Sequence, residues 1–148
     1  MEFTEFQCPY CNNIAPIIQD LMNKYPKEIK FVYKHFPLGF HDRAPAASAA
    51  SIAAQKQGKF WEFRYALAPY FRDLSDENFI KVAKEVGLDI EKFKKDMVLD
   101  STMQARINED FELGVKVGVQ GTPNFYINGK RQDRFSVQLI EKMLKESK

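Results

Sequence analysis

The chain has 148 residues, 45% of them hydrophobic and 28% charged, and its 22 Lys and Arg against 20 Asp and Glu leave a net charge of +2. This length predicts about one domain with its own core, and the high apolar content with a low net charge excludes an intrinsically disordered chain. The longest stretches without a charged residue, 7–19 and 117–129, are shorter than the about 18 apolar residues that a transmembrane helix needs. Charges of both signs are interleaved, which argues against a nucleic-acid-binding protein.

The chain opens with the pattern of a strand, a helix and a second strand. Residues 2–7 alternate between apolar and polar side chains and predict a short strand. Pro9 falls in the first helical turn, apolar residues then recur at helical spacing, and Pro16 is expected to kink the helix without ending it. Residues 28–36 alternate again. Two strands joined through a helix are expected to be parallel, with a right-handed crossover.

The middle of the chain, from about residue 44 to residue 117, has helical patterns only. An Ala-rich segment is expected to end at Gly58, and an aromatic-rich segment follows it. Ser75 and Asp89 are suited to cap two further helices, and an apolar residue recurs every four positions in the last one. Because no strand pattern interrupts this stretch, we interpret it as an all-helical insertion.

The end of the chain predicts a hairpin followed by a helix. Residues 118–123 are a turn cluster, 124–127 a short apolar strand, and Asn128-Gly129 a strong two-residue hairpin signal. The charged residues 130–134 suit an exposed edge strand. A serine cap and a hydrophobic staple then predict the C-terminal helix.

The two cysteines, Cys8 and Cys11, lie at the predicted junction of the first strand and the first helix. A disulfide scaffold spreads its cysteines to close long loops, so this pair does not fit one. The free amides and the dipole of a helix N-terminus stabilise a thiolate at Cys8, and the two-residue spacing lets Cys11 close a small disulfide ring. Because the thiolate is the nucleophile of thiol–disulfide exchange, this placement predicts a redox pair.

Zinc binding is the main alternative for the cysteines. The sulfur and nitrogen ligands that zinc prefers would come from Cys8, Cys11, His35 and His41. The separation between the cysteines and the first histidine is long for a compact zinc finger, and His35 falls in a predicted strand. A chain of this size also has enough core without a metal. A pair of buried cysteines without chemistry is a further alternative that stays open.

Several segments of the chain together match one family. They are E-F-x-x-F-x-C-P-Y-C at 2–11, I-A-P at 14–16, F-P-L at 36–38 followed by His41, the Ala-rich run 44–54, Q-G-K-F-W at 57–61 and G-V-Q-G-T-P at 118–123. With these segments the sequence resembles the DsbA-like branch of the thioredoxin superfamily over nearly its full length. C-P-Y-C alone also occurs in glutaredoxin-like proteins, whereas the helical insertion and Q-G-K-F-W favour the DsbA-like branch.

The resemblance implies an α/β thioredoxin fold, β-α-β and then β-β-α, with an all-helical insertion between the second strand and the cis-proline loop. The thioredoxin-like domain would comprise residues 1–40 and 117–148, and the inserted helical subdomain residues 41–116. The family usually has one more strand before the one that leads into C-P-Y-C, so we expect a trimmed N-terminus or a sheet with one strand fewer. Residues 130–134 lack the apolar alternation usual after the hairpin turn, so we expect a short or irregular strand there.

The resemblance also implies roles for single residues. Cys8 would be the exposed attacking cysteine and Cys11 the shielded resolving one. Pro123 matches the family's cis-proline beside the disulfide, and Thr122 would offer its backbone to an extended substrate chain. Glu2 lies six residues before Cys8, where thioredoxin-like proteins often bury a carboxyl group that can shuttle a proton for the resolving cysteine. The alternative for Glu2 is a solvated residue near the chain end.

The residues between and around the cysteines refine this interpretation. Pro9 opens the helix, and Tyr10 can tune the Cys8 thiolate by packing or hydrogen bonding but brings no cationic imidazole. Cys8 is therefore expected to be less activated than in family members that have His at that position. His35 and His41 are expected to be structural rather than catalytic.

Together these observations predict a thiol–disulfide oxidoreductase that forms disulfides in exported, cysteine-containing polypeptides. Its redox centre would be the Cys8–Cys11 disulfide, without a further cofactor or a metal. A reductase or isomerase of the same fold is the alternative, and a zinc-stabilised or redox-inert binding module is the alternative of another class. The resemblance implies a monomer, a membrane quinone-linked redox partner, and a location outside the cytoplasm with the signal or anchor segment absent from this sequence. A cytoplasmic location stays open.

Overall fold

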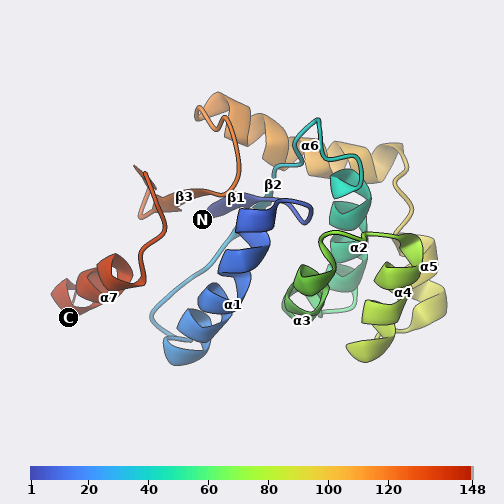
Figure 1. Ribbon diagram of the computed structural model, residues 1–148, viewed down its shortest axis with the longest axis horizontal. Helices are drawn as coiled ribbons and strands as arrows, with labels where there is room; N and C mark the ends of the chain where they lie inside the picture. The colour runs from blue at the N-terminus through green and yellow to red at the C-terminus, as the bar shows by residue number, and fades with distance from the viewer. Residues whose placement is uncertain (148) are drawn as a thin grey trace.

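A four-stranded sheet organises the computed structural model, which describes residues 1–147 (Figure 1). The strand order is β2-β1-β3-β4, with bounds β1 Glu2–Thr4, β2 Tyr33–His35, β3 Asn124–Ile127 and β4 Lys130–Gln132. β1 pairs with β2 in parallel, whereas β3 is antiparallel to both β1 and β4. The predicted parallel pair, the hairpin and the short last strand are therefore confirmed.

The first two strands are shorter than the alternating sequence pattern predicted. β1 ends at Thr4 because the chain then turns toward the first helix, where the Phe6 carbonyl oxygen accepts a hydrogen bond from the Asn12 side chain, 2.7 Å away. The pairing with the second strand begins at Val32, whose carbonyl oxygen accepts from the Glu2 amide at 2.9 Å. Residues 28–32 of the predicted strand lie outside β2.

Two helices belong to the sheet domain. α1 (Pro9–Lys24) joins β1 to β2 and continues through Pro16, as predicted. α7 (Val137–Glu146) follows the hairpin, and Ser136 caps it by accepting a hydrogen bond from the Leu139 amide. Figure 1 shows α7 beyond the hairpin, at the end of the molecule away from the inserted helices.

The inserted segment is helical throughout, as predicted. Its helices are α2 Ala44–Lys56, α3 Phe60–Leu67, the 3-10 helix η1 Ala68–Tyr70, α4 Asp76–Glu85, α5 Ile90–Asp96 and α6 Ser101–Lys116. Ser75 and Asp89 cap α4 and α5 with their side chains. The aromatic-rich segment after Gly58 is divided into α3 and η1 because Pro69 has no amide hydrogen to continue an α-helix. Within residues 1–147, no helix is both long enough and apolar enough to span a bilayer.

The main core fills the insertion and reaches the cysteines. α2 is buried along most of its length because its small Ala side chains let the neighbouring helices approach closely. Phe6, two residues before Cys8, is buried in this core together with Phe63 of α3 and Phe79 of α4. The segment that carries the cysteines is thus anchored on the insertion as well as on the sheet.

Candidate active site

The C-P-Y-C motif forms the start of α1. Cys8 is the N-cap residue in extended conformation, and its sulfur accepts a hydrogen bond from the Cys11 amide, 3.2 Å away. Pro9 is the first helical residue, a position that needs no amide hydrogen. Both thiols are free. The predicted placement of the two cysteines between the first strand and the first helix is confirmed.

The expectation that Cys8 is exposed is wrong for this structure. Cys8 is 3% exposed and Cys11 is fully buried, so Cys8 is only slightly the more accessible thiol. The cause is the neighbouring loop, because the Cys8 sulfur donates to the Thr122 carbonyl oxygen at 3.6 Å. The loop before β3 thus covers one side of the Cys8 sulfur.

Local contacts make Cys8 the acidic thiol of the pair. Its pKa is lowered to about 6, chiefly by a hydrogen bond from the Cys11 side chain, while burial opposes the shift. The side chain of Thr122 and the Cys11 amide contribute further lowering. The Thr122 hydroxyl is buried and has no hydrogen-bond partner in the structure, which leaves it free to serve a thiolate. At neutral pH Cys8 is therefore mostly ionised.

Cys11 has the opposite behaviour. Burial raises the pKa of the Cys11 thiol far above its usual value, and the neighbouring Cys8 raises it further. Cys11 consequently keeps its proton when Cys8 has lost its own. The two thiols thus divide into a nucleophile and a proton-holding partner, which is the division that dithiol exchange requires.

Glu2 is a buried carboxyl group, not a solvated residue near the chain end. It lies on β1 with 1% exposure, and its Oε2 atom has no hydrogen-bond partner. Burial raises the pKa of Glu2 to about 7, although the Arg64 charge lowers it in part. Glu2 also raises the pKa of Cys11, which shows that the two groups are electrostatically coupled. Proton transfer between Glu2 and Cys11 stays a prediction.

The loop before β3 faces the first cysteine. The Thr122–Pro123 peptide bond is cis, as the resemblance implied. The Thr122 carbonyl oxygen lies 3.6 Å from the Cys8 sulfur, so the loop and the helix start form two sides of one site. The docking of a substrate chain on Thr122 and Pro123 stays a prediction.

Two aromatic side chains are exposed on the segments next to Cys8. Tyr10 is 73% exposed and Phe40 is 78% exposed. The segment that carries Phe40 is held beside the motif by Gln7, whose side chain donates to Asp42 at 3.1 Å and accepts from the Arg43 amide at 2.9 Å. The sequence analysis did not single out Phe40, because an isolated aromatic residue in a loop has no distinguishing pattern.

Three polar residues around the pair were not predicted from the sequence. Glu5 is fully buried, and its Oε2 atom lies 2.8 Å from Nδ1 of His41. Asn12 donates to the carbonyl oxygens of Phe6 and Cys8, at 2.7 and 2.8 Å. Arg64 is buried and donates to the Cys11 carbonyl oxygen at 3.2 Å. Position in the first turn of α1 could have indicated Asn12, whereas no sequence signal marks Arg64.

The structure does not assemble the zinc ligands that the sequence analysis considered. His41 is bound to Glu5. His35 packs against Tyr33 and Phe60, and burial lowers its pKa to about 4. Over residues 1–147, no three His, Cys, Asp or Glu side chains are grouped so that they could hold a metal ion. Both histidines therefore have structural contacts, as expected.

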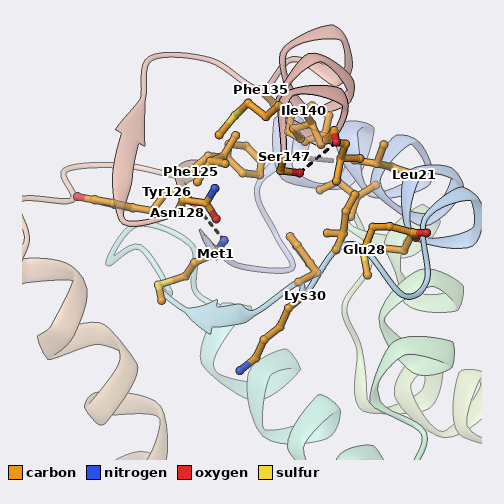
Figure 2. Close-up of a pocket in the computed structure, with 17 residues that line it drawn as sticks. Met1, Leu21, Glu28, Lys30, Phe125, Tyr126, Asn128, Phe135, Ile140 and Ser147 are labelled. Carbon is orange, nitrogen blue, oxygen red and sulfur yellow. Dashed lines mark hydrogen bonds between the residues drawn. The ribbon is translucent and has the colours of Figure 1, made fainter.

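An apolar cavity lies at the other end of α1 and is separate from the cysteines. Its volume is about 320 Å³, and Leu21 of α1, Phe125 of β3 and Ile140 of α7 help to line it (Figure 2). Neither cysteine is among its lining residues. The chemistry therefore belongs to the start of α1 and not to this cavity.

A dithiol at a helix start, a cis-proline loop facing it and a helical insertion together define a DsbA-like domain of the thioredoxin class. The family model described as "DSBA-like thioredoxin domain" matches residues 1–145, and the chain belongs to this family. Solved structures agree with the fold. A thioredoxin-like oxidoreductase from Silicibacter pomeroyi DSS-3 is 29% identical with a TM-score of 0.81, over 99% of this chain and 83% of that one. The thiol-disulfide exchange protein α-DsbA2 from Wolbachia pipientis is 23% identical with a TM-score of 0.82, over 99% and 80%.

Curated relatives include much longer proteins. The Na(+)/H(+) antiporter NhaA 3 of Salinispora tropica is 32% identical over 132 residues, which are 88% of this chain and 20% of the antiporter. The Na(+)/H(+) antiporter NhaA 1 of Mycolicibacterium gilvum is 34% identical over 133 residues, 88% of this chain and 22% of the antiporter. The chain thus spans about a fifth of the length of these relatives.

Proposed function

We propose that this domain is a thiol–disulfide oxidoreductase that forms disulfides in cysteine-containing polypeptides. The observation that carries the proposal is the asymmetry of the pair, in which the pKa of Cys8 is lowered to about 6 while that of Cys11 is raised. A low-pKa thiol is a good leaving group and is stable in the reduced protein, and both properties favour an oxidant.

The reaction starts from the Cys8–Cys11 disulfide. A substrate thiolate attacks the Cys8 sulfur, the bond between the two cysteines breaks, and a mixed disulfide forms. Cys11 leaves with the electron pair and takes a proton, which Glu2 can supply because its pKa is about 7. A second substrate thiolate then attacks the substrate sulfur of the mixed disulfide and releases Cys8 as a thiolate. Two electrons have moved from the substrate to the domain.

Substrate binding would use the surface next to Cys8. The backbone of Thr122 and Pro123 borders the sulfur, and an extended chain can add to such an edge through main-chain hydrogen bonds. The exposed rings of Tyr10 and Phe40 offer apolar contacts for side chains of an unfolded polypeptide. Shallow apolar contacts of this kind suit many substrates rather than one.

Regeneration of the disulfide requires an electron acceptor. We extend the proposal to a membrane quinone-linked partner, to action as a monomer and to a location outside the cytoplasm, all of which rest on the family resemblance. Ion transport is not part of the proposal, because the similarity to the antiporters covers about a fifth of their length. The sequence of this chain could equally serve as one module of a longer protein.

The test is oxidation of a reduced, unfolded protein that contains two cysteines. We expect stoichiometric oxidised domain to convert it to the disulfide form, and no conversion with Cys8→Ala. Given the disulfide form of the same substrate, Cys11→Ala should form a mixed disulfide through Cys8 that persists, because no second thiol is present to resolve it. The reduction potential decides the direction, since a value near about −120 mV indicates an oxidant and one near about −270 mV a reductant. A free-thiol count that stays unchanged after mild oxidation would instead support a redox-inert binding module, and a metal content of about one zinc per chain would support the zinc-stabilised one.

A further inference from the structure

Arg64 of α3 places a positive charge inside the protein, next to the start of α1. Its side chain is 2% exposed, and it is the one buried Arg or Lys in the part of the chain that the structure describes. Burying a charge is costly unless nearby groups compensate for it. The groups that surround Arg64 therefore indicate which negative charge or dipole compensates for its burial.

The hydrogen-bond partners of Arg64 are neutral and belong to Cys11 of the redox motif and to Asn12, the residue after it. Nη1 donates to Oδ1 of Asn12 at 2.9 Å, and Nη2 donates to the Cys11 carbonyl oxygen at 3.2 Å. The guanidinium carbon lies 5.1 Å from the centre of the Phe6 ring and 5.6 Å from that of Tyr33. These contacts orient the guanidinium group and pair two of its donors with acceptors, but they do not neutralise its charge.

No carboxylate is paired with Arg64 among residues 1–147, since none of the ion pairs there includes it. Of the two buried carboxyl groups nearby, Glu5 is bound to His41. Glu2 is within electrostatic reach, because Arg64 lowers its pKa against the effect of burial. Glu2 is therefore one acidic group that Arg64 can stabilise. The Cys8 thiolate, which exists only in the reduced state, is a second acidic group, in the motif that Arg64 contacts at the Cys11 carbonyl oxygen.

We propose that Arg64 is a positioning residue of the redox pair, whose buried charge favours the reduced, anionic dithiol over the neutral disulfide. The inference rests on the proposed function and deepens it, because it assigns part of the oxidising character to the helical insertion. Reduction by two glutathione thiols breaks the Cys8–Cys11 bond and forms one glutathione disulfide. Cys11 takes one proton and the other goes to solvent, so the domain gains one negative charge. Arg64 stabilises the product of this step more than its reactant.

A purely structural role for Arg64 makes a different prediction. In that case Arg64 would act only by holding Asn12, which in turn holds the carbonyl oxygens of Phe6 and Cys8. Arg64→Lys keeps the charge but loses the planar group that bonds Asn12 and Cys11 together. Arg64→Met keeps an apolar stem and removes the charge. The two substitutions separate charge from hydrogen bonding.

The experiment measures the ratio of reduced to oxidised domain in glutathione buffers, by mass shift after alkylation. It compares the unchanged protein with Arg64→Gln, Arg64→Met and Arg64→Lys. Arg72→Gln is the matched control, because it removes the same charge from an exposed residue of the insertion. Absorbance at 240 nm against pH reports the Cys8 thiolate in the same samples.

We expect the two neutral variants to lower the equilibrium constant for reduction about tenfold, which corresponds to about 30 mV. The thiolate titration should move to higher pH by about one unit in both. Arg64→Lys and the control should stay within about threefold of the unchanged protein, which is at most about half of the tenfold effect in free energy. If Arg64→Gln does not fold, Arg64→Met provides the neutral comparison.

Two outcomes would overturn the proposal. One is a folded neutral variant with an unchanged equilibrium constant for reduction. The other is an Arg64→Lys variant whose equilibrium constant falls as far as that of the neutral variants. If neither neutral variant folds, Arg64→Lys decides alone. An equilibrium constant for reduction close to that of the unchanged protein would support the role of the charge, and a tenfold lower one would contradict it. An unchanged protein that does not equilibrate with glutathione at all would contradict the proposed function, which keeps the two failures distinct.

Discussion

The two ends of α1 are stabilised in different ways. At the N-terminal end Asn12 and the charged side chain of Arg64 are buried. Asn12 donates to the Cys8 carbonyl oxygen of the redox motif, and Arg64 donates to that of Cys11. At the C-terminal end Leu21 faces the apolar cavity, and no residue of the opposing α7 is buried (Figure 2). The ion pair between Lys24 and Glu141, which bridges the two helices there, is largely exposed.

The difference indicates which end of α1 is more sensitive to substitution. A buried polar group needs a partner at one distance and angle, and a lost partner leaves an unsatisfied atom behind. An incompletely covered apolar surface needs only hydrophobic side chains of suitable size. The redox end should therefore tolerate few substitutions and the cavity end many.

The largest expected effect is at Asn12. Asn12→Ala removes the donor to the Phe6 and Cys8 carbonyl oxygens and the acceptor for Arg64, so three buried groups lose a partner. We expect a loss of about 3 kcal/mol in the free energy of unfolding, measured with urea. Asn13→Ala, an exposed neighbour on the same helix, should cost less than about 0.5 kcal/mol. Equal losses in the two variants would contradict the contrast between the ends.

The next effect is the pH dependence that Glu2 gives to stability. Because burial raises its pKa from 4.5 to about 7, the folded reduced protein binds more protons than the unfolded chain between these values. The contribution of Glu2 is therefore fully present below pH 4.5 and is lost as the pH rises through 7.

Glu2→Gln should remove this dependence. Between pH 5 and pH 8 the unchanged protein should lose about 2 kcal/mol more stability than the variant, measured by urea unfolding of the reduced forms. The Cys8 thiolate contributes to both proteins and largely cancels in the difference. Parallel pH profiles would show that Glu2 titrates as a solvated carboxyl group.

A smaller effect is expected at the cavity end. Ile140 of α7 lines the cavity and is partly exposed, so truncation enlarges a space that is already open to solvent. Ile140→Ala should cost about 1 kcal/mol, below the 2–5 kcal/mol that is typical of a fully buried Ile. Urea unfolding measures this loss, with the exposed Gln138→Ala as control. A loss above about 3 kcal/mol would mean that α7 is packed as tightly as the redox end.

The same contrast explains what could be predicted from the sequence. Periodicity located the helices of the insertion, and Ser75, Asp89 and Asn128-Gly129 marked caps and a turn, because these signals are local. The motif at Cys8 and Cys11 was equally visible. The ends of the strands could not be predicted from such local signals. β1 ends at Thr4, before the Phe6 carbonyl oxygen accepts a hydrogen bond from the Asn12 side chain instead of from a strand.

The polar surroundings of the cysteines depend on distant parts of the chain. Arg64 reaches Cys11 from 53 positions away, and His41 reaches Glu5 from 36 positions away. No periodicity encodes such a meeting, because a single Arg in a helix has the same local pattern whether it faces solvent or the core. The near-complete burial of Cys8 was missed for the same reason, since the Thr122 loop that covers it comes 114 positions later.

The smallest expected effect concerns the Thr122 side chain. Its hydroxyl is buried without a hydrogen-bond partner, and the side chain lowers the pKa of Cys8. Thr122→Val replaces the hydroxyl with a methyl group of similar size, so packing is kept while one donor to the thiolate is lost. The pKa of Cys8 should rise above its value of about 6 and the reduction potential should fall, because the reduced state loses a stabilising contact.

The magnitude should be modest, since the hydrogen bond from Cys11 is the larger cause of the low pKa and remains in place. We expect a rise of less than about one unit, equivalent to less than about 1.4 kcal/mol, in the titration of thiolate absorbance at 240 nm. Thr102→Val, the same substitution at an exposed position of α6, controls for the change of residue type and should leave the titration unchanged. A Thr122→Val protein that titrates like the control would assign the acidity of Cys8 to the start of α1 alone. The two sides of the site would then differ as the two ends of α1 do. The start of α1 would lower the pKa of Cys8, and the Thr122 loop would only cover the sulfur.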